Sequence, residues 1–304
     1  MGSRNINEMT KTFFGLIRPF TLLAPLIVSS SIMLASFFYQ GSDMQLSFIF
    51  INMIIPASLS LSLLNGASNA LNQATDWKTD VYGKPYRPIP KGKITVKKAL
   101  LISSILYIIS LSLASIINFA FLLFVLSITI FTITYSIPPR VKDKLFFNQL
   151  WIGLPRGFLG ILASWSVFGT VFQPLPIIIA VIAFLFLFGG CITKDVTDCE
   201  ADKKTGTKTL INTYGMKRAG MISFPFLFFP FLLIPLSINA GWISIHFWLL
   251  TFLAIPAYYI FHLMMEDQKA SKVFENTRAW TVMYLTYFTF ASSFSLLTII
   301  SVIL

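Results

Sequence analysis

The stretch "IIIAVIAFLFLFGGC", residues 177–191, has no charged residue and no regular alternation of apolar and polar side chains. An unbroken apolar run of this kind is typical of a helix rather than of a half-buried strand. A helix of about 20 apolar residues crosses a hydrocarbon core about 30 Å thick, where the backbone must satisfy its own hydrogen bonds. The stretch therefore predicts a helix that spans a membrane.

Similar runs recur along the whole chain. Of its 304 residues, 56% are hydrophobic and only 12% are charged, whereas about 25% are charged in an average soluble domain. We expect nine spans, at residues 20–40, 46–70, 97–117, 119–138, 148–169, 174–194, 219–239, 242–264 and 280–303. The predicted fold is an all-α integral membrane protein with about nine transmembrane helices, forming a single transmembrane domain over residues 1–304.

The net charge of +11 follows the predicted topology. All but one of the 23 Lys and Arg residues precede the first span or lie in every second connection after it. The positive-inside rule assigns these segments to the cytoplasm, with the N-terminus inside and the C-terminus outside a multi-pass cell membrane. The charge thus reflects topology in membrane lipid and predicts no nucleic-acid partner. The exception, Arg156, lies inside the fifth span.

Aspartates gather in the two long cytoplasmic connections. "NQATDWKTD", residues 72–80, follows the second span, and "KDVTDCEADKKTG", residues 194–206, follows the sixth. At about 100° per residue, each stretch aligns three oxygen-bearing side chains within roughly 80° on one face of a helix. These are Asn72, Asp76 and Asp80 in the first stretch and Asp195, Asp198 and Asp202 in the second.

Carboxylates placed so close together repel one another unless a cation neutralises them, and clusters of oxygen ligands suit Mg²⁺. Basic residues flank both stretches, including Lys84, Arg87 and Lys91 after the first and Lys194 at the start of the second. Mg²⁺-holding carboxylates together with Lys and Arg form a clamp for a diphosphate. The alternative is that these residues are solvated loop charges. This alternative is more plausible for one stretch taken alone than for two such stretches on the same side of the membrane.

These residues resemble the UbiA superfamily of intramembrane prenyltransferases. The first aspartate stretch is similar to the family's N-x-x-x-D-x-x-x-D signature, and the second to its other Asp-rich motif. Three further stretches are similar to family sequences: "KPYRPIPKG" at 84–92, "YSIPPR" at 135–140 and "LIRPFTL" at 16–22. One departure is Gln73, because many members carry Asp directly after the first motif's Asn.

The resemblance implies nine transmembrane helices around a central cavity, capped by the two Asp-bearing loops. It also implies prenyl transfer from an isoprenyl diphosphate, whose apolar tail enters the cavity. Two Mg²⁺ would bridge the diphosphate to the two motifs and promote ionisation to an allylic cation. The expected metal ligands, which include the expected catalytic residues, are Asn72, Asp76, Asp80, Asp195, Asp198 and Asp202.

Basic and aromatic residues are expected to contact the substrates. Lys84, Arg87 and Lys194 would stabilise the departing diphosphate. Tyr135 would shield the cation with its ring. Arg140, at the end of the same "YSIPPR" stretch, is expected to bind substrate as well.

Two further arginines have two interpretations each. Arg156 is a charge within a span, which favours a side chain that lines the acceptor or diphosphate pocket, although it could also extend to the cytoplasmic interface. Arg18, at the entrance of the first span, could bind an acidic acceptor or act only as a topology signal.

Other functions and acceptors remain open at this level. A terpene cyclase would use the same ionisation and capture the cation internally. A transporter or scaffold is disfavoured, because transporters place their polar sites near the membrane midplane, whereas these acids gather at one face. The hydrophobic acceptor could be an aromatic quinone precursor or an isoprenoid glycerol phosphate, and "RPFTL" favours the aromatic one.

Overall fold

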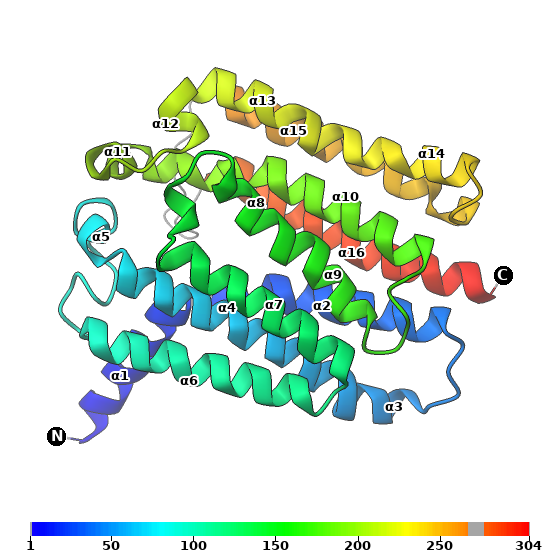
Figure 1. Ribbon diagram of the computed structural model, residues 1–304, viewed down its shortest axis with the longest axis horizontal. Helices are drawn as coiled ribbons and strands as arrows, with labels where there is room; N and C mark the ends of the chain where they lie inside the picture. The colour runs from blue at the N-terminus through cyan, green and yellow to red at the C-terminus, as the bar shows by residue number, and fades with distance from the viewer. Residues whose placement is uncertain (1, 267–276, 304) are drawn as a thin grey trace.

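The computed structural model describes residues 2–266 and 277–303, which form helices and connecting loops and, within these ranges, no strand. Long helices lie side by side along one direction (Figure 1). The α-helices are α1 (Gly2–Ile17), α2 (Pro19–Tyr39), α3 (Leu46–Ile49), α4 (Ile55–Thr75), α5 (Trp77–Gly83), α6 (Val96–Ser115), α7 (Phe119–Ser136), α8 (Phe147–Gly153), α9 (Gly160–Trp165), α10 (Pro174–Gly190), α11 (Asp195–Thr205), α12 (Leu210–Tyr214), α13 (Met216–Phe228), α14 (Leu233–Asn239), α15 (Ala254–Met265) and α16 (Arg278–Ile303). The prediction of an all-helical fold is confirmed.

Eight helical segments in the described ranges are long and apolar enough to cross a membrane. They are Pro19–Tyr39, Leu46–Thr75, Val96–Ser115, Phe119–Ser136, Pro174–Glu200, Met216–Asn239, Ile245–Met265 and Arg278–Ile303. Each coincides with one of the expected spans. The remaining expected span, 148–169, is helical as α8, a π-helical segment η3 (Leu154–Leu159) and α9. This segment is not among the eight, because polar side chains such as Asn148, Gln149 and Arg156 lower its mean hydropathy. The count of nine transmembrane helices therefore stays a prediction.

The helices form a closed ring around a central space. The order around the ring is α4, α2, α16, α10, η3 with α9, and α7, and each member contacts the next. α6 packs outside α4, and α13 and α15 pack together beside α10 and α16. Two large apolar clusters hold the two sides, one centred on α4, α6 and α7 and the other on α10, α13, α15 and α16. The space between the clusters is therefore framed by helices from both halves of the chain.

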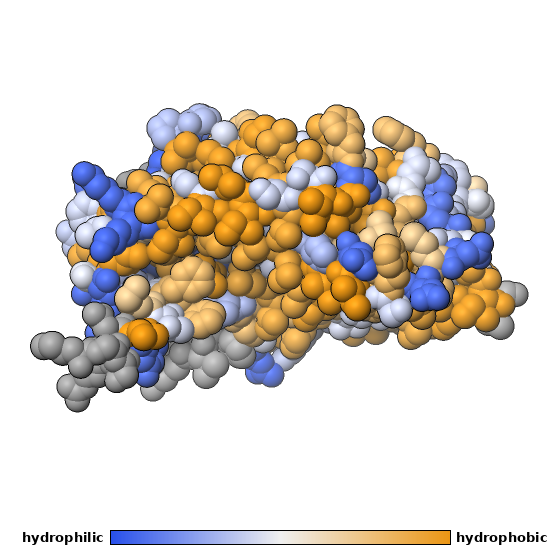
Figure 2. Space-filling view, turned by 90° about the horizontal axis from the view of Figure 1, so that it is seen from below, coloured by the Kyte–Doolittle hydropathy of each residue, from blue (hydrophilic) through white to orange (hydrophobic). Residues whose placement is uncertain are grey.

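The two ends of the bundle are polar and its middle is apolar. Figure 2 shows hydrophilic residues concentrated toward both ends, with a mainly hydrophobic band between them. α5 and α11, which carry residues of the two aspartate stretches, contact each other at one end, and α16 ends at the opposite one (Figure 1). Segments far apart in the sequence thus bring the two motifs together.

Candidate active site

The first motif lies where α4 gives way to α5. Asn72 is in the last turn of α4, Asp76 is at the break between the helices, and Asp80 is on α5. Asn72 and Asp76 line a polar pocket at the end of the bundle, and Asp80 is absent from its lining. The carboxylate of Asp80 is instead buried against Arg87, whose Nη1 donates to both oxygens at 3.0 and 2.8 Å. The break at Asp76 therefore separates side chains that the sequence places on one continuous helical face.

The second motif lies in the same pocket with all three of its aspartates. Asp195, Asp198 and Asp202 all line it, and α11 carries them after a short 3₁₀ segment, Cys191–Lys194. Lys84 from the loop after the first motif lies 2.6 Å from Asp198 Oδ1. This ion pair joins the two motifs directly. The structure thus brings five of the six expected metal ligands to one pocket.

A cation that the sequence analysis missed also binds the first motif. Lys142 Nζ donates to Asn72 Oδ1 at 2.8 Å and forms an ion pair with Asp76. Arg140, which was expected at the site, donates to Asp76 Oδ1 at 2.8 Å through its Nη2. Arg140 is the last residue of the "YSIPPR" stretch, and Lys142 lies two residues after it. That position, in a connection rich in Lys and Arg, is the signal that could have identified Lys142.

Tyr135 lies between two of these cations. Lys194 Nζ donates to its hydroxyl at 2.9 Å, and that hydroxyl donates to Asn148 Oδ1 at 3.0 Å. The ring centroid is 5.6 Å from Lys194 Nζ and 5.8 Å from Lys142 Nζ. Tyr135 lines the polar pocket as expected, and its hydroxyl holds Lys194 in place.

Several ionisable groups in and around the polar pocket have shifted pKa values. Burial lowers the pKa of Lys84 and of Lys142, although Asp198 and Asp76 oppose the change. The pKa of Asp202 is raised to about 7 by burial and by the negative charges of Asp198 and Asp195. These shifts show a site in which acids and bases are forced together away from water.

The donor chemistry of the pocket fits Mg²⁺. Its acids and Asn72 offer only oxygen ligands, and Asp195 Oδ2 is buried without a hydrogen-bond partner, as a site for a cation would require. In the described ranges, no three Asp, Glu, His or Cys side chains already converge on a point suited to a metal ion. Three of the expected ligands are instead paired with cations: Asp198 with Lys84, Asp80 with Arg87 and Asp76 with Lys142.

A larger, mainly apolar cavity adjoins this pocket. It shares Lys194 with the polar pocket. Its apolar walls include Leu61, Leu64, Ile128 and Leu187, from α4, α7 and α10. The site thus consists of a charged pocket at the end of the bundle and an apolar cavity next to it.

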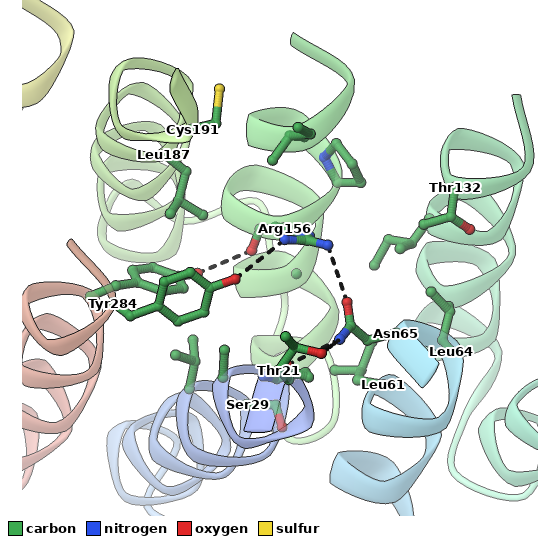
Figure 3. A pocket seen from close by; sticks show the side chains of 18 of the residues that line it. Thr21, Ser29, Leu61, Leu64, Asn65, Thr132, Arg156, Leu187, Cys191 and Tyr284 are labelled. Carbon is green, nitrogen blue, oxygen red and sulfur yellow. Dashed lines mark hydrogen bonds between the residues drawn. The ribbon is translucent and has the colours of Figure 1, made fainter. Parts of the chain in front are cut away.

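Arg156 reaches into the apolar cavity from η3 (Figure 3). Its Nη2 lies 3.3 Å from Asn65 Oδ1 and its Nη1 lies 3.5 Å from the Tyr284 hydroxyl. The expectation of a pocket-lining arginine agrees with this placement. Arg18, by contrast, lines neither space. It occupies a left-handed position (φ 56°) between α1 and α2, near enough to Lys84 for its charge to lower that lysine's pKa.

Gln73, the departure from the family pattern, has a structural task. Its side chain is buried and donates through Nε2 to the carbonyl oxygens of Gly15 and Leu16 at 3.0 and 2.8 Å. These are carbonyls at the end of α1, which lack partners within that helix. Gln73 therefore ties α1 to α4 beside the first motif without facing the pocket.

The sequence model of the UbiA prenyltransferase family matches residues 22–283 of this chain. The chain belongs to the UbiA prenyltransferase family. The family resemblance of the motifs is thereby confirmed. Together with the eight long apolar helices, membership of the UbiA family makes the chain an integral membrane protein.

Similar proteins extend this result. The digeranylgeranylglyceryl phosphate synthase of Methanosphaera stadtmanae is 34% identical over 173 residues, 56% of this UbiA chain and 61% of that protein. The synthase of the same name from Saccharolobus solfataricus is 28% identical over 203 residues, 67% and 71% of the two chains. The match spans about three fifths of the length of the Methanosphaera protein.

Solved structures share the fold. A UbiA homologue from Archaeoglobus fulgidus bound to DMAPP and Mg²⁺ has a TM-score of 0.74 at 22% identity, and covers 95% of this chain and 99% of its own. The same homologue bound to GPP and Mg²⁺ also has a TM-score of 0.74, at 23% identity and the same coverage. The helical bundle described above is thus the UbiA fold.

Proposed function

We propose that this UbiA-family chain transfers a prenyl group from an isoprenyl diphosphate to an isoprenoid glycerol phosphate lipid, within one transmembrane domain. The observation that carries the proposal is the meeting of both aspartate motifs in one polar pocket that adjoins an apolar cavity. The names of the similar synthases support the reaction, and the ligands of the Archaeoglobus homologue support the donor class.

The two spaces suit the two parts of the donor. The diphosphate would lie in the polar pocket, where Lys142 and Lys194 supply positive charge. Lys84 lies behind this lining, paired with Asp198. The prenyl tail would lie in the apolar cavity, which excludes water from the allylic carbon. Tyr135 would present its ring at the junction, next to Lys194.

The metal requirement follows from the acids of the pocket. Asn72, Asp76, Asp195, Asp198 and Asp202 would hold Mg²⁺, and Asp80 would join them if Arg87 released it. We propose two ions, one for each motif. When bound, Mg²⁺ supplies the positive charge that stabilises the leaving diphosphate. Lys84 and Lys142 would then be free to contact the diphosphate oxygens, because the metal would take over the neutralisation of Asp198 and Asp76.

The acceptor follows from the similar proteins rather than from the sequence motif. The preference for an aromatic acceptor, based on "RPFTL", is set aside, because Arg18 of that motif lines neither pocket and the similar synthases are named for a glyceryl phosphate product.

The membrane arrangement is part of the proposal. We propose α8, η3 and α9 as the ninth crossing, with α5 and α11 as a cap over the cavity. The first and last spans support an odd number of crossings. α2 begins at the end of the bundle that carries α5 and α11, and α16 finishes at the opposite end (Figure 1). The distribution of Lys and Arg supports a cytoplasmic N-terminus and active site, with the C-terminus outside.

Product analysis tests the proposal. The purified protein is incubated with Mg²⁺, geranylgeranyl diphosphate and an isoprenoid glycerol phosphate, and the products are analysed by mass spectrometry. We expect transfer, and a loss of several orders of magnitude in Asp76→Ala and Asp198→Ala. Asp43→Ala, a matched change in an exposed connection outside the site, should retain activity. A cyclic hydrocarbon from the diphosphate alone would show a cyclase instead, and full function of both variants would indicate a transporter or scaffold.

A further inference from the structure

The guanidinium of Arg156 has no acidic partner in the part of the chain that the structure describes. Its two side-chain hydrogen bonds go to neutral oxygens, those of Asn65 and Tyr284, and both are long, at 3.3 and 3.5 Å (Figure 3). A charge that faces an apolar cavity within a membrane span is costly and is kept where a ligand or partner neutralises it. The side chain of Arg156 is therefore suited to bind an anion inside this cavity.

The backbone around Arg156 is arranged to direct its side chain into the cavity. A Cβ on Gly157 would lie 2.6 Å from the N and Cα atoms of Phe184, so only glycine permits η3 to lie this close to α10. The Tyr287 hydroxyl donates to the carbonyl oxygen of Arg156 at 3.0 Å. One side of the segment is thus packed against α10 and its backbone is held by α16, and π-helical segments of this kind are frequent at functional sites.

The two neutral partners are held just as firmly. Asn65 Nδ2 donates to the carbonyl oxygen of Thr21 at 3.0 Å, which turns Asn65 Oδ1 toward Arg156. The ring of Tyr284 packs on Trp280 with a centroid distance of 4.3 Å. Asn65 also lies seven residues before Asn72, two helical turns along the same face of α4. Asn65 and Asn72 thus lie on the same side of α4, Asn65 in the apolar cavity and Asn72 in the motif pocket.

The chemistry that fits this cluster is an oxyanion attached to an apolar body. A guanidinium binds phosphate through two parallel hydrogen bonds, and the Tyr284 hydroxyl can donate a third. The walls around it are aliphatic and suit an isoprenoid chain. The donor diphosphate has its own cations and metal ligands in the polar pocket, so the anion at Arg156 is a second one.

We propose that Arg156, with Asn65 and Tyr284, binds the phosphate group of the acceptor lipid. This inference rests on the proposed transferase function, because it names the site of that reaction's second substrate. Because Lys194 and Arg156 line the same cavity, the acceptor's hydroxyl would face the allylic carbon while its phosphate stays on the arginine. A membrane phospholipid offers the same phosphate chemistry, and the experiment separates the two sources.

Binding without metal tests the site apart from the diphosphate pocket. The full chain in nanodiscs of zwitterionic lipid with EDTA is titrated with an isoprenoid glycerol phosphate and with its dephosphorylated counterpart. We expect the wild type to prefer the phosphate form by about tenfold or more, the range for charge-assisted hydrogen bonds. Arg156→Gln should lose this preference and Arg156→Lys should keep part of it. Lys97→Gln, which removes a charge from an exposed position on α6, should match the wild type.

Two results of the titration in zwitterionic nanodiscs would overturn the inference, and a third would come from nanodiscs that contain phosphatidic acid. One is equal binding of both ligands by the wild type, and the other is an unchanged preference in Arg156→Gln. If nanodiscs containing phosphatidic acid abolish binding, the site selects a general lipid phosphate, and the assignment to the acceptor is overturned. Asn65→Asp keeps the arginine but supplies it with an internal carboxylate, so it should lose the preference as well even if Arg156→Gln folds poorly.

Steady-state kinetics separates this inference from the proposed function. In Arg156→Lys we expect the KM for the acceptor to rise about tenfold and the KM for the diphosphate to stay unchanged, because the arginine would bind only the acceptor. A rise confined to the KM for the diphosphate would assign Arg156 to the donor while the transferase proposal stands. If the wild type transferred nothing, the proposed function would fail, and the metal-free titration would still decide the binding site.

Discussion

Lys84 and Asp198, which belong to the two different aspartate motif regions, form an ion pair with Nζ 2.6 Å from Oδ1. The pair connects the loop after α5 with α11 across the mouth of the cavity. It also occupies a carboxylate that Mg²⁺ would need and a cation that the diphosphate would need. In the proposed reaction, Mg²⁺ and the diphosphate would each replace one partner of this pair.

This relationship predicts opposite effects of one substitution. In Lys84→Met, Asp198 loses its competitor, so Mg²⁺ alone should bind more tightly than to the wild type. The kcat/KM for the donor should fall about 10- to 100-fold, because a charge-assisted contact to the diphosphate is lost. Calorimetry with Mg²⁺ and turnover measurements check the two effects. Lys97→Met is the control for charge removal, and weaker Mg²⁺ binding in Lys84→Met would contradict the exchange.

Asp202 predicts a pH dependence of stability. Its pKa, raised to about 7 from 3.8, means that the folded metal-free protein holds a proton that the unfolded chain releases between about pH 4 and about pH 7. The stabilisation is complete below about pH 4 and is lost as the pH rises through about 7. The melting temperature with EDTA should therefore fall over this window less steeply in Asp202→Asn than in the wild type.

Magnesium should reverse this trend at the upper end. As a proposed ligand, Asp202 would bind Mg²⁺ in its ionised form, so the stabilisation by added Mg²⁺ should grow as the pH passes about 7. Melting curves with and without Mg²⁺ at several pH values measure it. Parallel curves for the wild type and Asp202→Asn would remove Asp202 from the metal site.

Gln73 predicts a stability effect with little effect on catalysis. Gln73→Leu leaves the carbonyls of Gly15 and Leu16 without their donor, at a cost of about 1–3 kcal/mol. The melting temperature should drop, and activity at low temperature should remain. Gln73→Glu keeps the shape but faces the same carbonyls with an acceptor, so it should be at least as unstable. A selective loss of Mg²⁺ affinity in Gln73→Leu would instead place this residue at the metal site.

The close approach of η3 to α10 predicts a contrast between two glycines. Gly157→Ala puts a methyl group against the backbone of Phe184 and should destabilise the protein by about 1–3 kcal/mol. It should also raise the KM for the acceptor, since Arg156 is the neighbouring residue. Gly160→Ala meets only the carbonyl oxygen of Pro155 at 3.4 Å and should be tolerated. Similar melting temperatures for both variants would refute the packing argument.

Expectations that depend on local properties agreed well with the structure. Apolar run lengths predicted the helices, and the order of the spans predicted that Asp76, Asp198 and Asp202 lie at the same end. The spacing failed at Asp80, because a helix break at Asp76 changed the direction of the following side chain and Arg87 bound it. It also missed Lys142, whose contact with Asp76 joins residues far apart in the chain.

The membrane environment, the helical class, the one-sided placement of the acids and the family could all be predicted from the amino-acid sequence. These follow from hydropathy, periodicity and charge order, which are carried by neighbouring residues. Three features could be seen only in the folded chain: the cation that neutralises each aspartate, the contact of Gln73 with α1, and the contacts of Arg156 with Asn65 and Tyr284 inside an apolar cavity. Such contacts depend on helix breaks, on a π-helical segment and on packing between distant helices, and local hydropathy carries no information about these.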